Sequence, residues 1–422
     1  MYPEKNLSTK AKFTVAAMLL FAGASCYAQK IATLEVNLSR PAFGMKIPVS
    51  VNLDEITYLS DTLLALYENK DGRREAVAFQ IEAGNPRKMT WLVASGNSEN
   101  EKHVYELTSE KSKFPPAVNA TARDGALIIH TGEQNLLQYF FKTVYPPPGV
   151  DSAYRRSGFI HPLWSPHGQE LTRIQPPDHY HHYGIWNPWT QVEFEGEKLD
   201  FWNINSKQAT VRFANFVSVG GGPVFAEFEA LHEHVVLKKT GTDKVAMNEL
   251  QSVRVYEPDK SNDCFIVDFN INMNCAGESP FKILEYRYAG LGWRTTRAWD
   301  RMNSMVLTSE GKDRKSADGS KARWCIVQGE IDDDYAGVVM MSFPTNYNHP
   351  EPLRIWPENQ YNRGDMFANF CPTQDMDWNL MPGNKYNLRY RFLVYNGRLD
   401  REKAESAWNY FAYPPKVTVR KQ

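Results

Sequence analysis

The sequence has 422 residues, a formal net charge of −1 and an aromatic content of 13%. No block of basic residues occurs, which excludes nucleic acid as a partner, and no apolar run reaches the about eighteen residues of a membrane-spanning helix. Abundant tyrosine and tryptophan suit a sugar ligand, because pyranose faces stack on aromatic rings. Large β cores use the same residues, so composition leaves both interpretations open.

The N-terminal segment has the pattern of an export signal. Three lysines precede a short apolar run over residues 13–24, and small residues offer a cleavage site before Gln29. The run is too short to span a bilayer. We therefore predict a signal peptide over residues 1–28 and a periplasmic or cell-surface protein. A lipid anchor at Cys26 is the open alternative.

Strand-like patterns dominate the next part of the chain. Apolar and polar residues alternate with period two in four short runs separated by turns: 57–67, 75–81, 89–93 and 103–107. These runs predict a small N-terminal β-sandwich over residues 29–115, which ends at a pair of prolines.

A second, longer series of strand-like runs follows. These runs cover 126–130, 136–145, 211–217, 224–236, 249–256, 264–273, 281–288, 305–308, 323–331, 336–343 and 386–395. Many strands and few helices predict an all-β fold, with a large antiparallel double-sheet supersandwich over residues 116–422. One C-terminal helix is predicted, because Asp400 is a good N-cap and apolar residues recur at helical spacing from 404 to 411.

Four cysteines remain after removal of the signal segment: Cys264, Cys275, Cys325 and Cys371. An oxidising compartment permits disulfides, and Cys264 and Cys275 flank one predicted strand, so a bridge between them stays open. No pair is separated by only two residues. We expect free, buried cysteines.

The segment 146–202 carries little β pattern and much unusual chemistry. Five of the ten histidines fall within its central part: His161, His167, His179, His181 and His182. Ordered loops of this length inside a compact domain usually serve a function. We therefore predict that the functional site of the protein lies in this segment.

Three interpretations of this histidine cluster compete. In the first, the imidazoles line a sugar pocket, and one acts as general acid or base with Asp178 orienting its tautomer. In the second, they bind a divalent metal such as zinc, iron or manganese, although the spacing is not that of a standard zinc motif. An extended segment would place His179 and His181 on one face and His182 on the other. In the third, the histidines are structural and bond to the main chain.

Further candidates lie in residues 284–294. Glu285 and Arg287 share one face of a predicted strand, where they could form a catalytic base with its orienting partner or a plain salt bridge. Trp293 and Arg294 follow directly and predict stacking on a sugar ring and binding of its hydroxyl or anionic groups.

Three more histidines require an explanation. His232 and His234 share one strand face, for which a solvated face is favoured over a pair of ligands. His349 lies on a predicted loop near Arg354 and Trp356, a combination typical of substrate binding.

Several of these residues together resemble those of a bacterial family of unknown function that is often called "methane oxygenase PmoA"-like. The resemblance covers roughly residues 120–415 and is carried by His161-Pro162-Leu163, Gly168, Thr172-Arg173, Asp178-His179, His181-His182, Gly184-Ile185-Trp186 and Asp200-Phe201-Trp202. The oxygenase activity is not carried over, because the subunit of that name is an integral membrane protein. The resemblance implies instead a distant relation to galactose-mutarotase-like supersandwiches, which bind sugars on a concave sheet face. Tyr180 and Tyr183 stand where that family is expected to have a proline and a basic residue, so the charge of the substrate stays open.

We predict an exported enzyme that uses histidine-centred acid–base chemistry on a sugar, of epimerase, lyase or glycosidase type. A lyase or epimerase is favoured because no pair of carboxylates at a set separation is apparent. The predicted catalytic residues are His179, His181, His182, Asp178 and Glu285. The predicted substrate-binding residues are His161, Arg173, Trp186, Arg287, Trp293, Arg294 and His349. A non-catalytic carbohydrate-binding protein and a metal-dependent oxidoreductase are the alternatives, and a divalent metal is the one cofactor left open.

Overall fold

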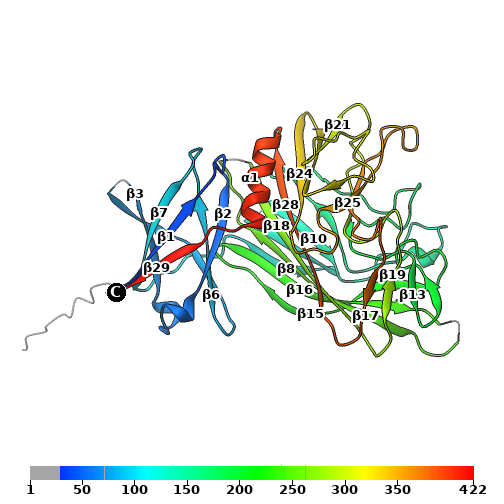
Figure 1. The fold of residues 1–422 in the computed structure, drawn as a ribbon, viewed down its shortest axis with the longest axis horizontal. Coiled ribbons are helices and arrows are strands. Elements are labelled where there is room, and N and C mark those ends of the chain that lie inside the picture. The colour runs from blue at the N-terminus through cyan, green and yellow to red at the C-terminus, as the bar shows by residue number, and fades with distance from the viewer. Residues whose placement is uncertain (1–28, 71, 133, 239, 262) are drawn as a thin grey trace, which may run out of the picture.

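The computed structural model describes residues 29–70, 72–132, 134–238, 240–261 and 263–422. Figure 1 shows a small β-sandwich on the left and a larger body of sheets on the right, with a helix between them. The predicted signal segment 1–28, which includes the candidate lipid-anchor residue Cys26, lies outside the described residues.

The small sandwich consists of a five-stranded and a three-stranded antiparallel sheet. The five-stranded sheet contains, in spatial order, β29 (Val417–Lys421), β1 (Gln29–Leu38), β7 (Glu101–Ser109), β3 (Ala65–Lys70) and β4 (Arg73–Val77). The three-stranded sheet contains β2 (Lys46–Asn52), β6 (Lys88–Ala94) and β5 (Phe79–Glu82). Every second residue of β1 from Ala32 to Leu38 is fully buried, as the period-two pattern requires for one face on a core.

The large body is built from three further sheets. The nine-stranded sheet contains β22 (Lys321–Ala322), β25 (Glu351–Ile355), β26 (Phe367–Phe370), β20 (Gly292–Arg294), β12 (Ile185–Trp186), β11 (Phe159–Leu163), β10 (Gln134–Phe140), β9 (Ala126–Thr131) and β8 (Asn119–Arg123). The eight-stranded sheet contains β15 (Ala209–Gly220), β16 (Phe225–Val236), β17 (Lys244–Tyr256), β18 (Cys264–Cys275), β28 (Tyr386–Asn396), β24 (Asp334–Ser342), β23 (Trp324–Ile331) and β21 (Ser304–Thr308). The four-stranded sheet contains β14 (Glu197–Leu199), β13 (Val192–Phe194), β19 (Phe281–Ile283) and β27 (Trp378–Leu380).

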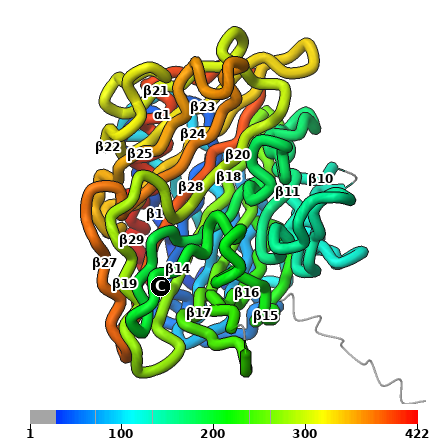
Figure 2. Tube along the Cα trace, turned by 90° about the vertical axis from the view of Figure 1, so that its right-hand side faces the viewer, coloured from blue at the N-terminus to red at the C-terminus, as the bar shows by residue number. Residues whose placement is uncertain are grey.

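The nine- and eight-stranded sheets pack face to face around the main core. Cross-strand neighbours of the nine-stranded sheet that point inward include Tyr139, Ile185 and Trp293. Tyr139 contacts Phe228 of the eight-stranded sheet at 4.6 Å between ring centroids, and Trp293 contacts Phe392 at 6.2 Å. Figure 2 shows the large body from its end, with β20 between β11 and β25. Because side chains alternate along a strand, the neighbours of these inward residues point to the opposite face.

Helix α1 (Arg401–Ala412) joins the two parts of the molecule. Its buried residues share one apolar cluster with the small sandwich and with the outward face of the eight-stranded sheet. Trp408 donates a 2.9 Å hydrogen bond from Nε1 to the carbonyl of Ser342 at the end of β24. After the helix, β29 returns to the small sandwich and pairs with β1. The domain boundary predicted near residue 115 stays a prediction. The structure adds that the C-terminal strand β29 also belongs to the small sandwich.

The helix begins where its cap residue predicts. The side chain of Asp400 accepts a hydrogen bond of 2.9 Å from the backbone N–H of Lys403. We expect Asp400→Ala to lower the free energy of unfolding by about 1 kcal/mol, because the backbone N–H of Lys403 in the first turn loses its partner. Urea unfolding of the variant and of Glu402→Ala measures this, and an equal loss in both would contradict a capping role.

The predicted all-β class, the antiparallel double sheet and the single C-terminal helix are confirmed. Four predicted strands are wrong in part. The run 75–81 is divided between β4 and β5, which belong to different sheets, and the run 136–145 ends as a strand at Phe140. Residues 57–64 do not form a strand, because the polar run at Asp61 forms a 3-10 turn, η2 (Asp61–Leu63), and β3 begins only at Ala65. The predicted strand 281–288 ends at Ile283, beyond which the chain follows side-chain contacts, beginning with the 2.8 Å bond from Glu285 N to Asp377. The other two 3-10 turns are η1 (Leu53–Glu55) and η3 (Ser152–Tyr154).

All four cysteines of the described chain are free and buried, as expected. Cys264 and Cys275 stand at the two ends of β18, and a strand of that length separates them by roughly 35 Å, far beyond the reach of a disulfide. Within the described part of the chain, no helix has both the length and the apolar character needed to cross a membrane.

Candidate functional site

The histidine loop is an excursion of residues 175–182 from the nine-stranded sheet. A bridge between Ile174 and Tyr183 closes it, and the N–H of Gln175 donates to the carbonyl of His182 at 2.8 Å. Two successive turns follow within it, with bonds from His179 N to Pro176 O and from His182 N to His179 O. The loop is therefore coiled and not extended. The expectation that His182 points away from its neighbours is wrong, because the second turn brings all three imidazoles together.

The loop lies over the face of the nine-stranded sheet that points away from the main core. Trp186, Arg294 and Phe367 stand one residue from inward-facing positions of β12, β20 and β26, so they point to this outer face. The ring of His182 packs against Trp186 and Phe367, each at 5.1 Å between centroids. Gly184 lets the end of the loop lie directly against the backbone of Ile160 in β11, since a Cβ at position 184 would stand 2.1 Å from the carbonyl oxygen of Ile160.

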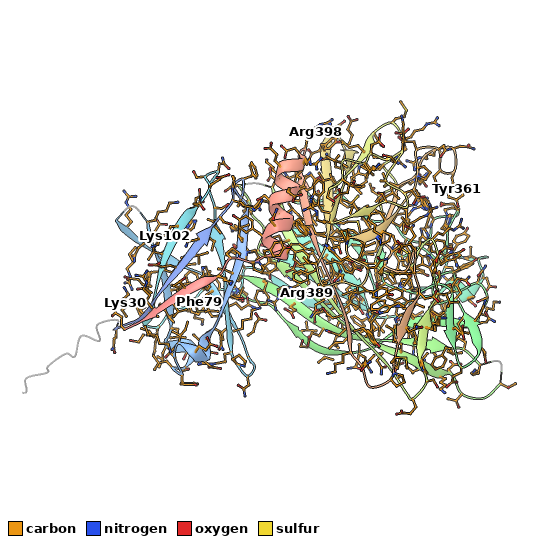
Figure 3. All side chains as sticks on the ribbon, in the orientation of Figure 1. Lys30, Phe79, Lys102, Tyr361, Arg389 and Arg398 are labelled. Carbon is orange, nitrogen blue, oxygen red and sulfur yellow. The ribbon has the colours of Figure 1, made fainter. Side chains whose placement is uncertain are left out.

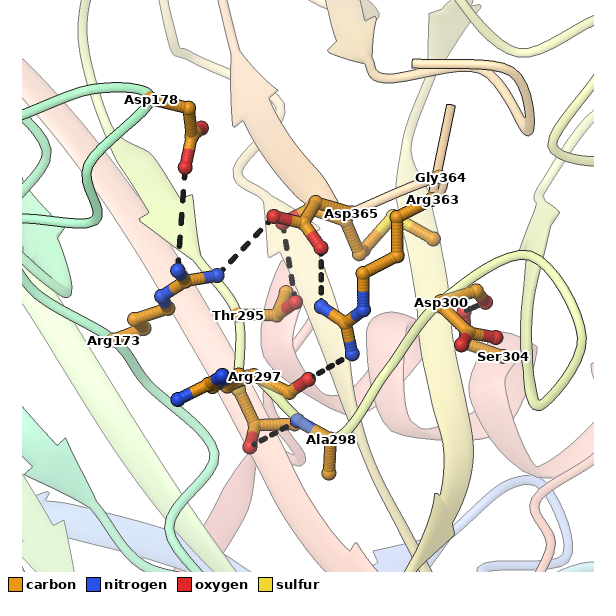
Figure 4. A network of polar contacts seen from close by, with 12 residues as sticks. Arg173, Asp178, Thr295, Arg297, Ala298, Asp300, Ser304, Arg363, Gly364 and Asp365 are labelled. Atoms are coloured by element: carbon orange, nitrogen blue, oxygen red, sulfur yellow. Dashed lines mark hydrogen bonds and ion pairs between the residues drawn. The ribbon is translucent and has the colours of Figure 1, made fainter. Parts of the chain in front are cut away.

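A cluster of ion pairs forms the base of the site. Arg294 is 1% exposed and donates from Nη2 to Asp178 at 3.0 Å and to Asp365 at 2.8 Å. Arg173 reaches Asp365 at 3.1 Å, and Arg363 pairs with the other oxygen of Asp365 (Figure 4). Removing one member of such a buried ion pair destabilises the fold, because the charge of the other member is left without its partner.

Asp178 also holds His179 from behind. Its Oδ2 lies 2.8 Å from Nδ1 of His179, and Nε2 of that ring lies 3.1 Å from the hydroxyl of Tyr361. Burial alone raises the pKa of Asp178, but the hydrogen bond with His179 and the charge of Arg294 lower it well below its usual range. The carboxylate is therefore ionised at neutral pH. It fixes the ring orientation and favours a proton on Nδ1.

His181 and His182 complete the group, and burial lowers the pKa of both rings, that of His181 to about 3. Both are neutral at physiological pH. One candidate ligand nitrogen from each of His179, His181 and His182 lies within 4.8 Å of the other two. The three imidazoles could hold a metal ion.

Aromatic side chains from a distant part of the sequence cover the loop. Trp356 lies 4.9 Å from the ring of His179 and 4.5 Å from the guanidinium carbon of Arg294, and Tyr361 lies 5.1 Å from His179. Figure 3 places Tyr361 at the end of the large body that is remote from the small sandwich. The sequence indicated Trp356 as a candidate site residue only weakly, through its position near His349. It did not indicate Tyr361 or Asp365, because no pattern within 357–366 points to residues 173–182.

The structure brings eight of the twelve predicted site residues to this face. Six of them form or directly contact the cluster: His179, His181, His182, Asp178, Arg173 and Arg294. Trp186 is the seventh, but it is 1% exposed and packs beneath His182, so it supports the loop and has no free face for a sugar.

His161 lies beside the cluster and not within it. Its Nδ1 is 2.9 Å from the hydroxyl of Thr172, and burial lowers the pKa of the ring to about 4. By strand alternation from Phe159 it faces the same side of the sheet as Trp186. It is a neutral residue that fixes the start of the loop.

Trp293 cannot stack on a ligand as predicted. It is 0% exposed in the main core, and its Nε1 donates to the carbonyl of Leu171 at 2.9 Å. The prediction treated neighbours in sequence as neighbours in the site, whereas alternation along β20 sends Trp293 and Arg294 to opposite faces.

Glu285 and Arg287 are exposed and lie in the loop after β19. The described residues show no ion pair between them, so the predicted pair of base and orienting partner is absent from the structure. Arg287 lies over the rings of Tyr286 and Tyr288 at 5.7 and 5.5 Å. Glu285 has no contact with the histidine loop.

His349 belongs to a different neighbourhood next to helix α1. Its Nδ1 lies 3.2 Å from the hydroxyl of Ser342, and its ring stacks on Trp408 at 6.3 Å. His349 therefore takes no part in the histidine loop, because the turn at 346–350 faces the helix, and its role in substrate binding stays a prediction.

Glu351, beside His349, predicts a measurable pH dependence. It is fully buried, accepts bonds from Ser342 (2.5 Å), Asn346 (2.7 Å) and Tyr390 (2.9 Å), and burial raises its pKa to about 7 from 4.5. The folded state thus holds this proton more tightly than the unfolded state. Its contribution to stability is complete below pH 4.5 and is lost as pH rises through about 7.

We expect Glu351→Gln to remove this dependence. Relative to the variant, the native protein should lose up to about 1.4 kcal/mol of unfolding free energy per pH unit across that window. Urea unfolding of both proteins at several pH values measures the difference. Parallel curves would show that Glu351 does not titrate there.

His232 and His234 form a second, enclosed group with Glu249. The favoured solvated face is wrong, since both rings and the carboxylate are buried between the sheets. Glu249 lies 3.3 Å from Nδ1 of His232 and 3.0 Å from Nε2 of His234, and His232 reaches the hydroxyl of Tyr139 at 2.6 Å. Their partners are one another and the core, so the group is structural.

Comparisons with known proteins identify a family and find partial similarity to solved structures. Among solved structures, the chain is similar to an α-mannosidase from Enterococcus faecalis V583, with a TM-score of 0.45, 9% identity and coverage of 92% of this chain and 46% of that one. It is also similar to a protein of glycosyl hydrolase family 38 from Enterococcus faecalis, with a TM-score of 0.42, 10% identity and coverage of 92% and 47%. The chain thus spans about half the length of each structure. No curated protein is significantly similar to it.

The family model that matches describes a family of unknown function, DUF6807, and it covers residues 126–409. This range contains the histidine loop, the ion cluster and most of helix α1. The resemblance to the PmoA-like family stays a prediction. The chain belongs to the DUF6807 family of unknown function.

Proposed function

We propose that this protein is an exported carbohydrate-processing enzyme that performs acid–base chemistry on a sugar at the histidine loop. The observation that carries the proposal is the pair of Asp178 and His179. The carboxylate holds Nδ1 at 2.8 Å, while Nε2 points to the hydroxyl of the exposed Tyr361. A histidine that is oriented from one side and open on the other is suited to take and return a proton.

The surroundings of His179 suit a sugar. Tyr361 is 52% exposed and presents a ring on which a pyranose face can stack, while the buried Trp356 packs behind it and supports this ring. Nη1 of Arg294 is buried and has no hydrogen-bond partner in the described chain, so it can hold a hydroxyl or carboxylate oxygen of a ligand. Arg173 offers a second guanidinium with 19% exposure at the rim of the same cluster.

The electrostatics favour an epimerase or lyase over a two-carboxylate hydrolase. A general acid must carry a proton at working pH, and the pKa of Asp178 is held far too low for that role by His179 and Arg294. Asp365 forms ion pairs with three arginines, so its oxygens are already engaged and are not placed to act on a sugar. Proton removal by His179 from a carbon next to a carbonyl or carboxylate fits the groups that are present.

The test uses the exported chain with neutral and uronic-acid-containing polysaccharides in D₂O. Deuterium incorporation reports proton removal, ultraviolet absorbance reports an unsaturated product of elimination, and new reducing ends report hydrolysis. We expect the native protein and His167→Gln to act on the same sugar and His179→Gln to form at least about 10²-fold less product in the same time. Binding of a sugar by all three proteins without any product would favour a non-catalytic binding protein.

Export is a separate part of the proposal. N-terminal sequencing of the protein recovered from the producing cells should begin at Gln29. A product that begins at Cys26 and carries lipid would favour the membrane-anchored form. Recovery of the intact N-terminus from the cytoplasm would contradict export.

A further inference from the structure

We propose that His179, His181 and His182 together bind one divalent transition-metal ion. A catalytic role of this ion would rest on the function proposed above. The binding of the ion is argued from the geometry of the histidine loop alone. The three imidazoles belong to a stretch of four residues, and two turns direct them to one point.

The spacing of the donors is close to that of a metal site. The three candidate nitrogens lie within 4.8 Å of one another. An ion bound at about 2.0–2.1 Å by tetrahedral nitrogens needs a separation of about 3.4 Å between them. A small rotation of the rings, which pack at 4.6–5.1 Å between centroids, closes that gap.

The partners of the rings leave lone pairs free for an ion. Asp178 occupies Nδ1 of His179, as carboxylates do behind metal-bound histidines, and leaves Nε2 as the ligand atom. Among the described residues, Nε2 is hydrogen-bonded to the hydroxyl of Tyr361, and the 52% exposure of that residue leaves it room to move when an ion binds.

His181 and His182 show the same availability. Nδ1 of His182 is buried without a hydrogen-bond partner. Among the described residues, no side-chain hydrogen bond is recorded for either ring, although buried polar groups are nearly always paired. Ring packing with Tyr154, Trp186 and Phe367 holds both imidazoles in place.

The donor set defines the class of ion. Three imidazoles suit zinc and the neighbouring first-row ions, whereas magnesium and calcium require oxygen ligands. Arg173 and Arg294 add positive charge nearby, but Asp178 and Asp365 offset it through direct ion pairs. Three protein ligands leave a fourth position for water or a sugar oxygen, as in zinc sites that perform catalysis.

A bound ion would change which group accepts the proton. With Nε2 of His179 on the metal, a metal-bound hydroxide would take the proton from the sugar and become water, because the ion lowers the pKa of its water towards neutrality. The residues of the site and the expected products are unchanged.

Metal analysis and zinc titration of the purified full chain test the proposal. We expect about one equivalent of a first-row transition metal after reconstitution. His181→Ala and His182→Ala should lose stoichiometric zinc binding, and Asp178→Asn should weaken it about 10- to 100-fold. His167→Ala is the matched control, because His167 pairs with Asp334 away from the loop, and it should bind zinc like the native protein.

Cobalt substitution gives a readout that does not depend on turnover. Visible d–d absorption of the cobalt form should appear for the native chain and for His167→Ala and be absent for His181→Ala, with far-UV circular dichroism confirming that each variant is folded. Absence of zinc binding by the native chain, or equal binding by His181→Ala, would overturn the metal site. Sugar turnover that persists after complete metal removal would overturn the catalytic role of the metal and leave the proposed function intact. Metal binding without turnover of any sugar would overturn the proposed function and leave the metal site intact.

Discussion

Replacing Arg294 by methionine is expected to lower the free energy of unfolding by about 3–5 kcal/mol. The guanidinium is 1% exposed and serves Asp178 and Asp365 at once. Methionine fills much of the volume but leaves two carboxylates in a partly buried place without their shared cation. The loss therefore comes from uncompensated charge and not from a cavity.

Two further variants separate this cause from a general loss of packing. Arg363→Met removes another partner of Asp365, but that side chain is 41% exposed, so the change should be below about 1 kcal/mol. Adding Asp365→Asn to Arg294→Met should recover part of the loss, because the second change removes a carboxylate that has lost its buried partner. Urea unfolding of the native protein, Arg294→Met, Asp365→Asn and the double variant gives the coupling energy. Simple additivity would contradict the proposed role of Arg294.

Replacing His179 by glutamine is expected to lower turnover by about 10²- to 10⁴-fold while leaving the fold almost unchanged. Its side chain is 16% exposed and lies at the surface of the aromatic cover, so the cost in unfolding free energy should stay below about 1 kcal/mol. Steady-state kinetics on the sugar identified by the product screen measures the effect.

The split between kcat and KM distinguishes chemistry from binding. Loss of proton transfer lowers kcat with little change in KM, whereas loss of a ring contact raises KM. Asp178→Asn should give a smaller loss of kcat, because the imidazole remains but its orientation is less well fixed. A variant His179→Gln with native kcat would remove His179 from the reaction.

Much of the fold could be predicted from local pattern alone. The long strands β16, β17, β18 and β28 follow alternating or continuous apolar runs, and Asp400 marks the start of the helix. Strand predictions were wrong where the backbone is held by scattered hydrogen bonds and not by pairing with a neighbouring strand. Residues 284–291 are extended enough to imitate a strand, but their backbone partners are Asp377 and Thr373.

The histidine loop could be found in the sequence because its residues are close together in the chain. The members that complete the site could not be found. Trp356, Tyr361 and Asp365 reach the loop only because β20 and β26 lie side by side in the nine-stranded sheet. His349 illustrates the converse, since its loop begins a few residues before Trp356 and yet turns to helix α1. Neighbours in sequence were a poor guide to which side of a sheet a residue faces.

The pairing of β29 with β1 sets an order for the maturation of the molecule. The strand β1 stands between β7 and β29, so the five-stranded sheet acquires its complete hydrogen-bond ladder only after residues 417–421 have been synthesised. One edge of β1 therefore stays open until the chain between residues 38 and 417 has followed, which makes closure of this sheet a late, long-range event. We expect β1 and β29 to be among the last of the described strands to become protected as the protein folds.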